Sequence, residues 1–280
     1  MTASPTPPIV LSIAGSDPSG GAGVQADLKT FTALGTYGCA ALAGLTVQNT
    51  QGVRAAVPVD PDFVRDQVNA VLDDLPVAAT KLGMLSNAAV AEAVADLIDR
   101  RRADFGVIVL DPVMVATSGD ALLAEDAIAV VRDRLLRQAD LITPNLPEAA
   151  VLLGVEPAGD AAALESQARA LVVAGARAAL VKGGHLSGEL VDVLATADEM
   201  LVLRGQRIET RHTHGTGCTL SSAIAASAAR LGDTVATGIR PASVVAARDY
   251  LARAIAAGAE WRLSRTPETG HGPVNHLVAL

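Results

Sequence analysis

The sequence has little that would suit a membrane, a disulfide framework or a nucleic acid. Of its 280 residues, 2% are aromatic and two are cysteines, and the formal net charge is −8. Two cysteines make a disulfide framework improbable, and nucleic-acid binding needs basic patches and stacking aromatics. No apolar run is long enough to cross a bilayer, and the opening "MTASPTPPIV" has no basic region before an apolar core. We therefore expect a cytoplasmic, soluble protein without a nucleic-acid or membrane partner.

Short β-branched or apolar runs alternate with longer segments of helical spacing along the chain. This alternation predicts an α/β fold with a mostly parallel central sheet flanked by helices. Strands are expected at residues 9–14, 79–84, 107–111, 140–143 and 178–182, and helices at 24–34, 61–75, 88–101, 126–137, 164–174, 217–230 and 241–258. Residues 37–59 read as extended and predict a small β flap. Residues 1–8 are expected to be a disordered lead to one domain at 9–280.

Polar motifs follow the predicted strands, where ligands bind in open α/β sheets. They are "GSDPSGGAG", then Asp111, "TPNLPE", "VKGGH" and "HGTGC". The first is neither GxGxxG nor GxxxxGK[ST], which excludes the dinucleotide fingerprint and the P-loop. Each motif also has a structural interpretation: Asp111 can simply end a strand, Asn145 with Glu148 can cap a helix, and Lys182 can be a solvated charge.

The "HGTGC" motif is the most informative of these. Gly215, Thr216 and Gly217 precede an apolar helical run, so several backbone N–H groups can converge at a helix N-terminus and bind an anion. The alternative is an ordinary helix start with Cys218 as a small buried hydrophobe. Together with two carboxylates for a divalent metal and a lysine on the same rim, the motif indicates phosphoryl transfer.

Eight ordered motifs resemble one known family. They are "IAGSDPSGGAGVQADLKTF", "LTVQNTQGV", "KLGML", "LDPVM", "LITPNLPEA", "VKGGHL", "HTHGTGCTLSSAIAA" and "GHGPVNH". They resemble the hydroxymethylpyrimidine and phosphomethylpyrimidine kinases of thiamin biosynthesis, within the ribokinase-like superfamily, over about residues 9–276. The resemblance implies a ribokinase-like three-layer fold, ATP as co-substrate and Mg²⁺. It also implies phosphorylation of 4-amino-5-hydroxymethyl-2-methylpyrimidine and then of its monophosphate, by a homodimer joined through residues 37–59 whose chain is the kinase alone.

The resemblance also assigns roles to individual residues. It implies substrate contacts from Gly15, Ala22, Asp27, Gln48, Met84 and Val113. It implies metal binding by Asp111 and Glu148, and nucleotide binding by Asn145, Lys182, Gly183, Thr216 and Gly217. It implies catalysis by Cys218 with Gly215, Thr216, Gly217 and Lys182. Residues 115–121, "VATSGDA", have no periodicity and are a candidate lid over the site.

Cys218 stands where the sugar kinases of the superfamily mostly carry Asp. A free thiol has a pKa of roughly 8.5, and a helix N-terminus can lower it, so we expect Cys218 to ionise and act as general base. Cys218→Ala is then expected to lower turnover by roughly 10²- to 10⁴-fold, and Gly217→Val to do more harm. Two alternatives remain: a pyridoxal or pyridoxine kinase of the same fold, and a non-catalytic vitamin or nucleotide sensor.

Overall fold

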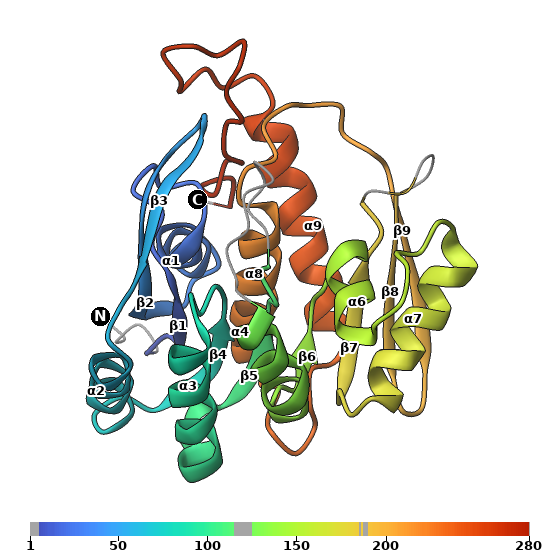
Figure 1. The fold of residues 1–280 in the computed structure, drawn as a ribbon. Coiled ribbons are helices and arrows are strands. Elements are labelled where there is room, and N and C mark those ends of the chain that lie inside the picture. Colours follow the sequence, from blue (N-terminus) through green and yellow to red (C-terminus); the bar gives the residue numbers. More distant parts are fainter. Residues whose placement is uncertain (1–5, 115–124, 185, 187–189, 280) are drawn as a thin grey trace, which may run out of the picture.

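A nine-stranded sheet runs through the computed structural model, which describes residues 6–114, 125–184, 186 and 190–279 (Figure 1). The strands are β1 (Ile9–Gly15), β2 (Tyr37–Asn49), β3 (Gly52–Pro58), β4 (Val77–Leu82), β5 (Val107–Leu110), β6 (Leu141–Ile142), β7 (Ala178–Lys182), β8 (Leu190–Thr196) and β9 (Met200–Gly205). Their order is β3-β2-β1-β4-β5-β6-β7-β8-β9. Strands β2, β1, β4, β5, β6 and β7 are parallel, and β3, β8 and β9 add antiparallel edges.

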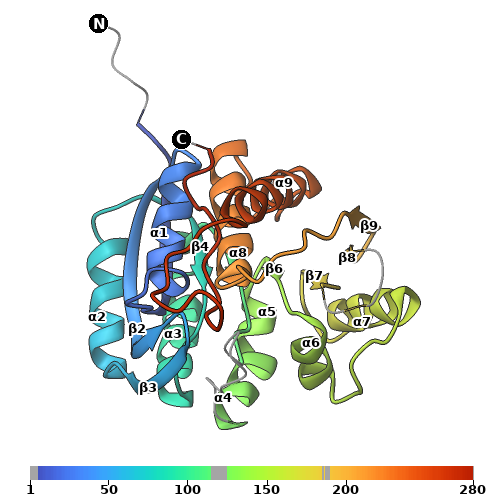
Figure 2. The same ribbon diagram turned by 90° about the horizontal axis from the view of Figure 1, so that it is seen from above.

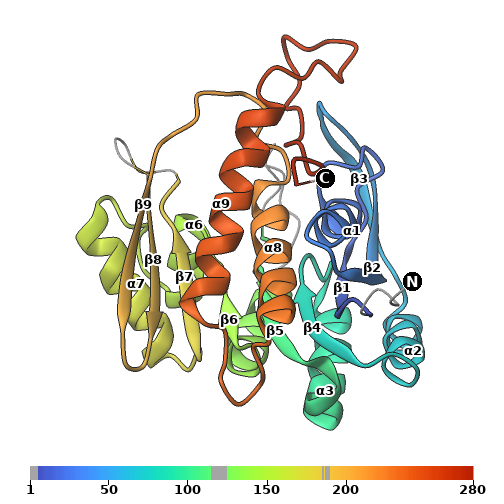
Figure 3. The ribbon, with the colours of Figure 1, turned by 180° about the vertical axis from the view of Figure 1, so that it is seen from behind.

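Helices cover both faces of the sheet. One face carries α1 (Gly23–Ala33), α8 (Thr216–Leu231) and α9 (Pro241–Gly258), which stand in front in Figure 3. The other face carries α2 (Pro61–Leu72), α3 (Ala88–Arg101), α4 (Glu125–Val130), α5 (Leu136–Gln138), α6 (Leu146–Leu153) and α7 (Ala161–Val173) (Figure 1). The view from above in Figure 2 shows the sheet between these two groups. The predicted three-layer fold is confirmed.

The period-two alternation of the central strands explains the two hydrophobic cores. In β5, Val107 and Val109 belong to the core shared with α8 and α9, while Ile108 and Leu110 belong to the core shared with α3 and α6. All four side chains are buried. A strand buried on both faces needs an unbroken apolar run, which is what the sequence has here.

The predicted flap is the outer part of a long strand. The first half of β2 pairs in parallel with β1, from Tyr37 to Gly44, and the second half pairs with β3. The β2–β3 ribbon therefore extends beyond the sheet, on the left in Figure 1. The segment that joins β9 to α8 and the C-terminal segment lie at the same end of the molecule.

Most predicted elements are present, with local differences. Strands β8 and β9 and helix α6 were not predicted, and the helix expected at 126–137 is interrupted by a π-helical turn at Val131–Leu135. The candidate lid at 115–121 and residues 1–5 of the predicted lead lie outside the described residues. Within the described ranges, the helices are all too short or too polar to cross a bilayer.

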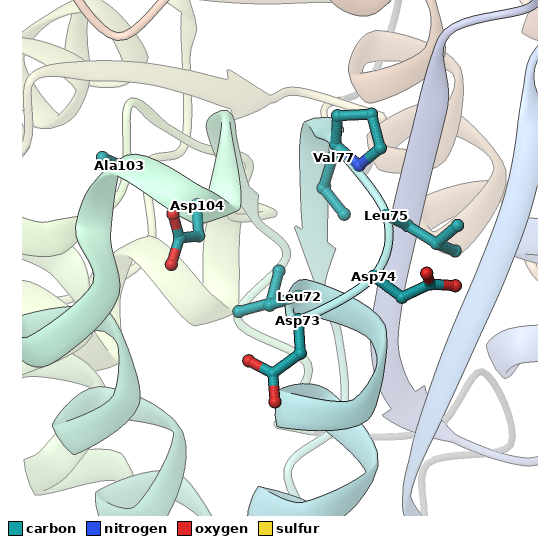
Figure 4. Close-up of a pocket in the computed structure, with 8 residues that line it drawn as sticks. Leu72, Asp73, Asp74, Leu75, Val77, Ala103 and Asp104 are labelled. Atoms are coloured by element: carbon teal, nitrogen blue, oxygen red, sulfur yellow. The ribbon is translucent and has the colours of Figure 1, made fainter.

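An open pocket of about 420 Å³ lies at the amino end of β4 (Figure 4). It is lined by Leu72, Asp73, Asp74, Leu75, Pro76, Val77, Ala103 and Asp104. Arg101 pairs with two of its carboxylates, at 2.6 Å from Asp73 and 2.9 Å from Asp104. The pocket is thus at the edge of the sheet opposite the polar motifs, and two of its three carboxylates are paired with Arg101.

Candidate active site

The polar motifs of the sequence meet at the carboxyl ends of the parallel strands. Gly15 ends β1, Asp111 follows β5, and Lys182 ends β7. Helix α8 begins beside them, with Gly215 as its N-terminal cap at φ 77°. Because parallel strands end at one edge of the sheet, residues far apart in the sequence become neighbours there.

An ion pair between the partly buried Lys182 and the buried Asp111 marks the centre of this edge. Lys182 Nζ lies 3.1 Å from Asp111 Oδ1, and Asp111 is 2% exposed. Asp111 also accepts hydrogen bonds from Thr143 Oγ1 and Ser221 Oγ, each at 3.2 Å. These contacts are long, and of the three donors among the described residues two are neutral. The Asp111 carboxylate is therefore held in place with weak compensation for its charge.

Glu148 is a second buried carboxylate near this pair. Its Oε2 accepts from the backbone N of Asn145 at 2.8 Å, and Asn145 Oδ1 accepts from the N of Glu148 at 2.9 Å, which forms a capping box at the start of α6. Burial raises the pKa of Glu148 to about 7; Lys182 opposes the rise and the negative charge of Asp111 adds to it. A nearby cation would relieve the repulsion between the two carboxylates.

The first turn of α8 faces the Lys182–Asp111 pair. A methyl group added to Gly217 would lie 3.5 Å from both Asp111 Oδ2 and Lys182 Nζ, so only the absent side chain separates the helix backbone from the pair. A methyl group added to Gly215 would lie 1.8 Å from the carbonyl oxygen of Gly21, so Gly215 is required where the two glycine-rich loops touch. Thr216 and Gly217 lie in the first turn; the N–H of Thr216 donates to the carbonyl oxygen of Thr213 at 3.3 Å, and the helix provides no backbone acceptor for the N–H of Gly217.

Cys218 lies in the same turn, half-buried, beside the start of α1. Burial raises the pKa of its thiol to about 11; Lys81 and a hydrogen bond from the backbone of Gly23 oppose the rise, and Asp27 and Asp111 add to it. The prediction that the helix N-terminus lowers this pKa is therefore wrong. Desolvation and two nearby carboxylates outweigh the favourable dipole.

A fully buried ion pair lies beneath the site, and sequence reasoning missed half of it. Lys81 Nζ lies 2.9 and 2.8 Å from the two oxygens of Asp27, and neither side chain is exposed. Ser12 and Ser222 each donate to Asp27 at 2.6 Å. Although burial opposes the charge on Lys81, the carboxylate of Asp27 keeps its pKa above the usual value.

This arrangement bears on the role expected for Asp27. Its carboxylate oxygens accept from protein donors and its side chain is fully buried, and its contact with a substrate stays a prediction. Ser222 lies one helical turn after Cys218, which places the pair one turn below the thiol. The signal for Lys81 was a lysine inside a strand otherwise predicted to be apolar.

The other expected substrate residues gather at the ends of β1, β2 and β4. A methyl group added to Gly15 would lie 2.3 Å from Met84 Cε, so this glycine leaves room for the Met84 side chain. Gln48 accepts from Thr46 Oγ1 at 3.1 Å, and that hydroxyl also lies 2.9 Å from the carbonyl oxygen of Ser16. Gln48 is thereby tied to the loop that follows Gly15.

Two further expected substrate residues, Ala22 and Val113, are half-buried. Ala22 N donates to Asp17 Oδ2 at 2.9 Å, and Val113 N donates to the carbonyl oxygen of Asp111 at 2.8 Å. Their contact with a substrate stays a prediction.

Asp17 and His214 join the two glycine-rich loops, a link that sequence reasoning missed. His214 Nε2 lies 2.7 Å from Asp17 Oδ2, and both side chains are buried. Burial favours a higher pKa for Asp17, but hydrogen bonds from His214 and Ser19 hold it at about 2. His214 N also donates to the carbonyl oxygen of Gly272 at 3.1 Å. The C-terminal segment thus supports the loop that enters α8.

The remaining nucleotide-binding candidates have structural partners. Gly183 N donates to Asp192 Oδ1 at 3.0 Å, and a methyl group added to Gly183 would lie 1.9 Å from the carbonyl oxygen of Val191. Asn145 is the cap of α6 already described. Tight packing and capping explain these residue types, and their contact with a nucleotide stays a prediction.

Comparison with known proteins places this site in a family. The family model described as phosphomethylpyrimidine kinase matches residues 17–275. A hydroxymethylpyrimidine/phosphomethylpyrimidine kinase of Rhizobium meliloti is 48% identical over 271 residues, which cover 96% of this chain and 97% of the relative. The chain belongs to the phosphomethylpyrimidine kinase family. Its expected classification as a phosphotransferase is confirmed.

Two kinases of known structure resemble this chain along most of its length. A phosphomethylpyrimidine kinase of Clostridium difficile has a TM-score of 0.76 and 35% identity, covering 89% of this chain and 99% of its own. A pyridoxal kinase of Bacillus subtilis, solved as an ADP complex, has a TM-score of 0.84 and 33% identity, covering 97% and 98%. The fold is thus shared by kinases named for two different substrates.

Proposed function

We propose that this chain transfers the γ-phosphoryl group of ATP to 4-amino-5-hydroxymethyl-2-methylpyrimidine and then to its monophosphate, in the cytoplasm, for thiamin biosynthesis. Family membership over residues 17–275 supports this proposal. The observation that carries it is the position of Gly217, whose missing side chain leaves the first turn of α8 open toward Asp111 and Lys182. Backbone N–H groups and an ammonium group that face the same space suit the binding of a phosphoryl group.

The chemistry asked of these residues is mainly electrostatic. Phosphoryl transfer passes through a loose transition state, so positioning and neutralising charge contribute more than strong activation of the nucleophile. Lys182 and the amides of Gly217 and Cys218 act on the phosphates in this proposal. The Cys218 thiol, with a pKa of about 11, is protonated at neutral pH and is better suited to lining the acceptor site than to abstracting a proton.

Asp111 and Glu148 fit a magnesium ion. Both are buried oxygen donors, and their mutual repulsion is part of what raises the pKa of Glu148 to about 7. Mg²⁺ commonly takes one or two carboxylates and completes its shell with water and substrate phosphates. When bound, the ion would neutralise phosphate charge, while Lys182 and Asp111 keep the surrounding groups in place.

The acceptor site in this proposal lies between the two glycine-rich loops. Met84 provides an apolar wall beside Gly15, and the amide of Gln48 can hydrogen-bond a ring nitrogen or the exocyclic amine. A vitamin B6 substrate is the second candidate, favoured by the TM-score of 0.84 to the pyridoxal kinase of Bacillus subtilis.

A substrate panel separates these functions. ADP release is measured with the pyrimidine alcohol, its monophosphate and pyridoxal, each with ATP and Mg²⁺. We expect kcat/KM for both pyrimidines to exceed that for pyridoxal by at least about 10-fold, the scale on which shape selects a substrate. A reversed order would identify a vitamin B6 kinase. Binding of any of these compounds without ADP release would identify a sensor.

A homodimer joined through residues 37–59 is also part of the proposal. Val47 and Val57, on the β2–β3 ribbon, are 50% and 55% exposed, and Tyr37 at the start of β2 is 56% exposed. Apolar side chains gathered on one ribbon favour a protein interface. Sedimentation of the full chain tests it, with Val47→Asp as the variant expected to give monomers.

A further inference from the structure

Ser86 has an unusual backbone conformation next to the candidate acceptor site. Among the residues that the structure describes, it is the only one besides glycines with a positive φ, at 63°. It follows Met84 by two residues and directly precedes Asn87, which caps α3. A non-glycine residue in the left-handed region carries a cost that surrounding contacts must offset, and such residues gather at functional sites.

The contacts that hold Ser86 come from β2. Ser86 Oγ donates to the carbonyl oxygen of Ala43 at 3.1 Å. A methyl group added to the next residue, Gly44, would lie 2.0 Å from Ser86 Oγ. The Ser86 hydroxyl therefore occupies the space that the absent side chain of Gly44 leaves open. The end of β4 is fastened to β2 at this point, although β1 lies between the two strands in the sheet.

Gly44 and Gly15 together confine the side chain of Met84. A methyl group on Gly15 would lie 2.3 Å from Met84 Cε, and one on Gly44 would lie 3.4 Å from it. Gly15 and Gly44 are partners across β1 and β2, where the register shifts. Met84 thus lies over a pair of glycines while Ser86 anchors the chain just after it. A methionine side chain is flexible, so it forms a defined wall only where its neighbours confine it.

We propose that Ser86 is a positioning residue for the acceptor site: its left-handed backbone and its bond to Ala43 hold the Met84 thioether against Gly15 and Gly44, as a fixed wall for the acceptor ring. This inference rests on the proposed function, because it takes the aromatic acceptor to be the ligand of Met84. In this proposal Ser86 contributes to the affinity for the acceptor. It does not affect the residues around Lys182 that are proposed to bind the phosphates.

Steady-state kinetics of Ser86→Ala tests the proposal. The variant loses the bond to Ala43 and keeps the strained backbone, so we expect KM for the pyrimidine alcohol to rise about fivefold or more, the scale of one lost hydrogen bond. KM for ATP and kcat should stay within about twofold of the wild-type values, because the residues proposed to bind the phosphates are not moved. Equal changes in both KM values, or no change in either, would contradict the proposal.

A pair of glycine variants tests the geometry independently. In Gly44→Ala the new methyl group collides with Ser86 Oγ, so KM for the pyrimidine alcohol should rise more than in Ser86→Ala. In the double variant G44A/S86G the collision is gone and the strain at position 86 is relieved. We expect its KM to fall below that of Gly44→Ala. A double variant no better than Gly44→Ala would contradict the proposed contact; should Gly44→Ala fail to fold, Ser86→Ala still decides.

Thr80→Val is the matched control. Thr80 Oγ1 donates to the carbonyl oxygen of Phe105 at 2.7 Å, so this variant also removes one side-chain bond to a backbone carbonyl, within β4. It should lower Tm without changing KM for either substrate; a KM change like that of Ser86→Ala would overturn the assignment. Failure of the proposed function is distinguishable, since the wild type itself would then not phosphorylate the pyrimidine alcohol.

Discussion

Two buried aspartates at opposite edges of the same sheet differ in how their charge is compensated. Asp140 precedes β6 and Asp111 follows β5, and each is 2% exposed. Asp140 accepts from Arg102 at 2.5 Å, from Ile108 N at 2.7 Å and from Arg177 at 2.9 Å. Two guanidinium groups and a backbone amide compensate it closely.

Asp111 has longer contacts and a second carboxylate nearby. Among the residues that the structure describes, its side-chain donors lie at 3.1 to 3.2 Å and Lys182 is the only charged one, and the negative charge of Asp111 helps to raise the pKa of Glu148. At the amino ends of the parallel strands (the amino edge), the charge of Asp140 is compensated by protein groups. At their carboxyl ends (the carboxyl edge), the charges of Asp111 and Lys182 would be compensated further by a bound cation and phosphates. Incomplete compensation at one edge is thus a physical mark of the site.

The largest effect is expected from Lys182→Met. Removing the ammonium leaves the phosphates without their cationic partner and Asp111 without its charged donor, so kcat should fall by about 10³-fold, the upper range for loss of one electrostatic contact. Steady-state ADP release measures it. Arg177→Met at the amino edge is the control, because Asp140 keeps Arg102; its kcat should match the wild type. A similar loss of kcat in Lys182→Met and Arg177→Met would contradict the proposed difference between the carboxyl and amino ends of the strands.

Lys81→Met should have the next largest effect, on stability. It leaves the Asp27 carboxylate buried without its counter-charge, so the free energy of unfolding in urea should fall by about 3 kcal/mol or more. Arg102→Met should cost less, because Asp140 retains Arg177. If both substitutions lower the free energy of unfolding equally, the Lys81–Asp27 and Arg102–Asp140 pairs are equivalent structural contacts. Lys81 then contributes no more to stability than Arg102 does.

Glu148 gives a pH dependence of known sign. Its pKa of about 7 in the folded protein lies above the ordinary value near 4.5, so the folded state holds the proton more tightly. The free energy of unfolding should therefore decrease as the pH rises from about 4.5 to about 7, by at most about 1.4 kcal/mol per pH unit. Relative to wild type, Glu148→Gln should lack this decrease in urea unfolding without Mg²⁺. Parallel pH profiles for the two proteins would refute it.

Cys218→Ala is expected to have the smallest effect. With a pKa of about 11, only about one thiol in 10⁴ is ionised at pH 7. The loose transition state needs little help from a base, so kcat should fall by less than about 10-fold. This replaces the loss of roughly 10²- to 10⁴-fold expected from the sequence alone. A measured loss of 10²-fold or more would restore Cys218 as general base.

The sequence predicts elements whose signals are local. Strands such as β7 and helices such as α3 and α9 have clear apolar periods and terminal signals, and their bounds match the prediction. Helix α6 was missed because it has only eight residues, and its capping box was given only as one possible interpretation of Asn145 and Glu148. Strand β8 pairs antiparallel with β7 and with β9, and the expectation of alternating β and α segments did not include such consecutive strands.

The candidate site was predicted in its residue types and less well in its electrostatics. The structure brings Asp111, Lys182 and Gly217 together, as strand-end reasoning expects. The partner of Asp27 and the pKa of Cys218 depend on burial and on charges far away in the sequence. No local pattern encodes the burial of the thiol or the nearness of Asp27 and Asp111, which raise the pKa of Cys218 although Lys81 opposes the rise, and this is why the direction of the shift was predicted wrongly.

The most direct test compares Asp111→Asn with Asp140→Asn, by measuring kcat per folded molecule for each. Asp111→Asn should lose about 10³-fold in kcat while its unfolding free energy stays near that of wild type, since its charge is poorly compensated. Asp140→Asn should lose about 3 kcal/mol of stability, with kcat within about twofold of wild type. An Asp111→Asn enzyme that keeps more than about a tenth of wild-type kcat would contradict the claim that the carboxyl edge is the phosphoryl-transfer site.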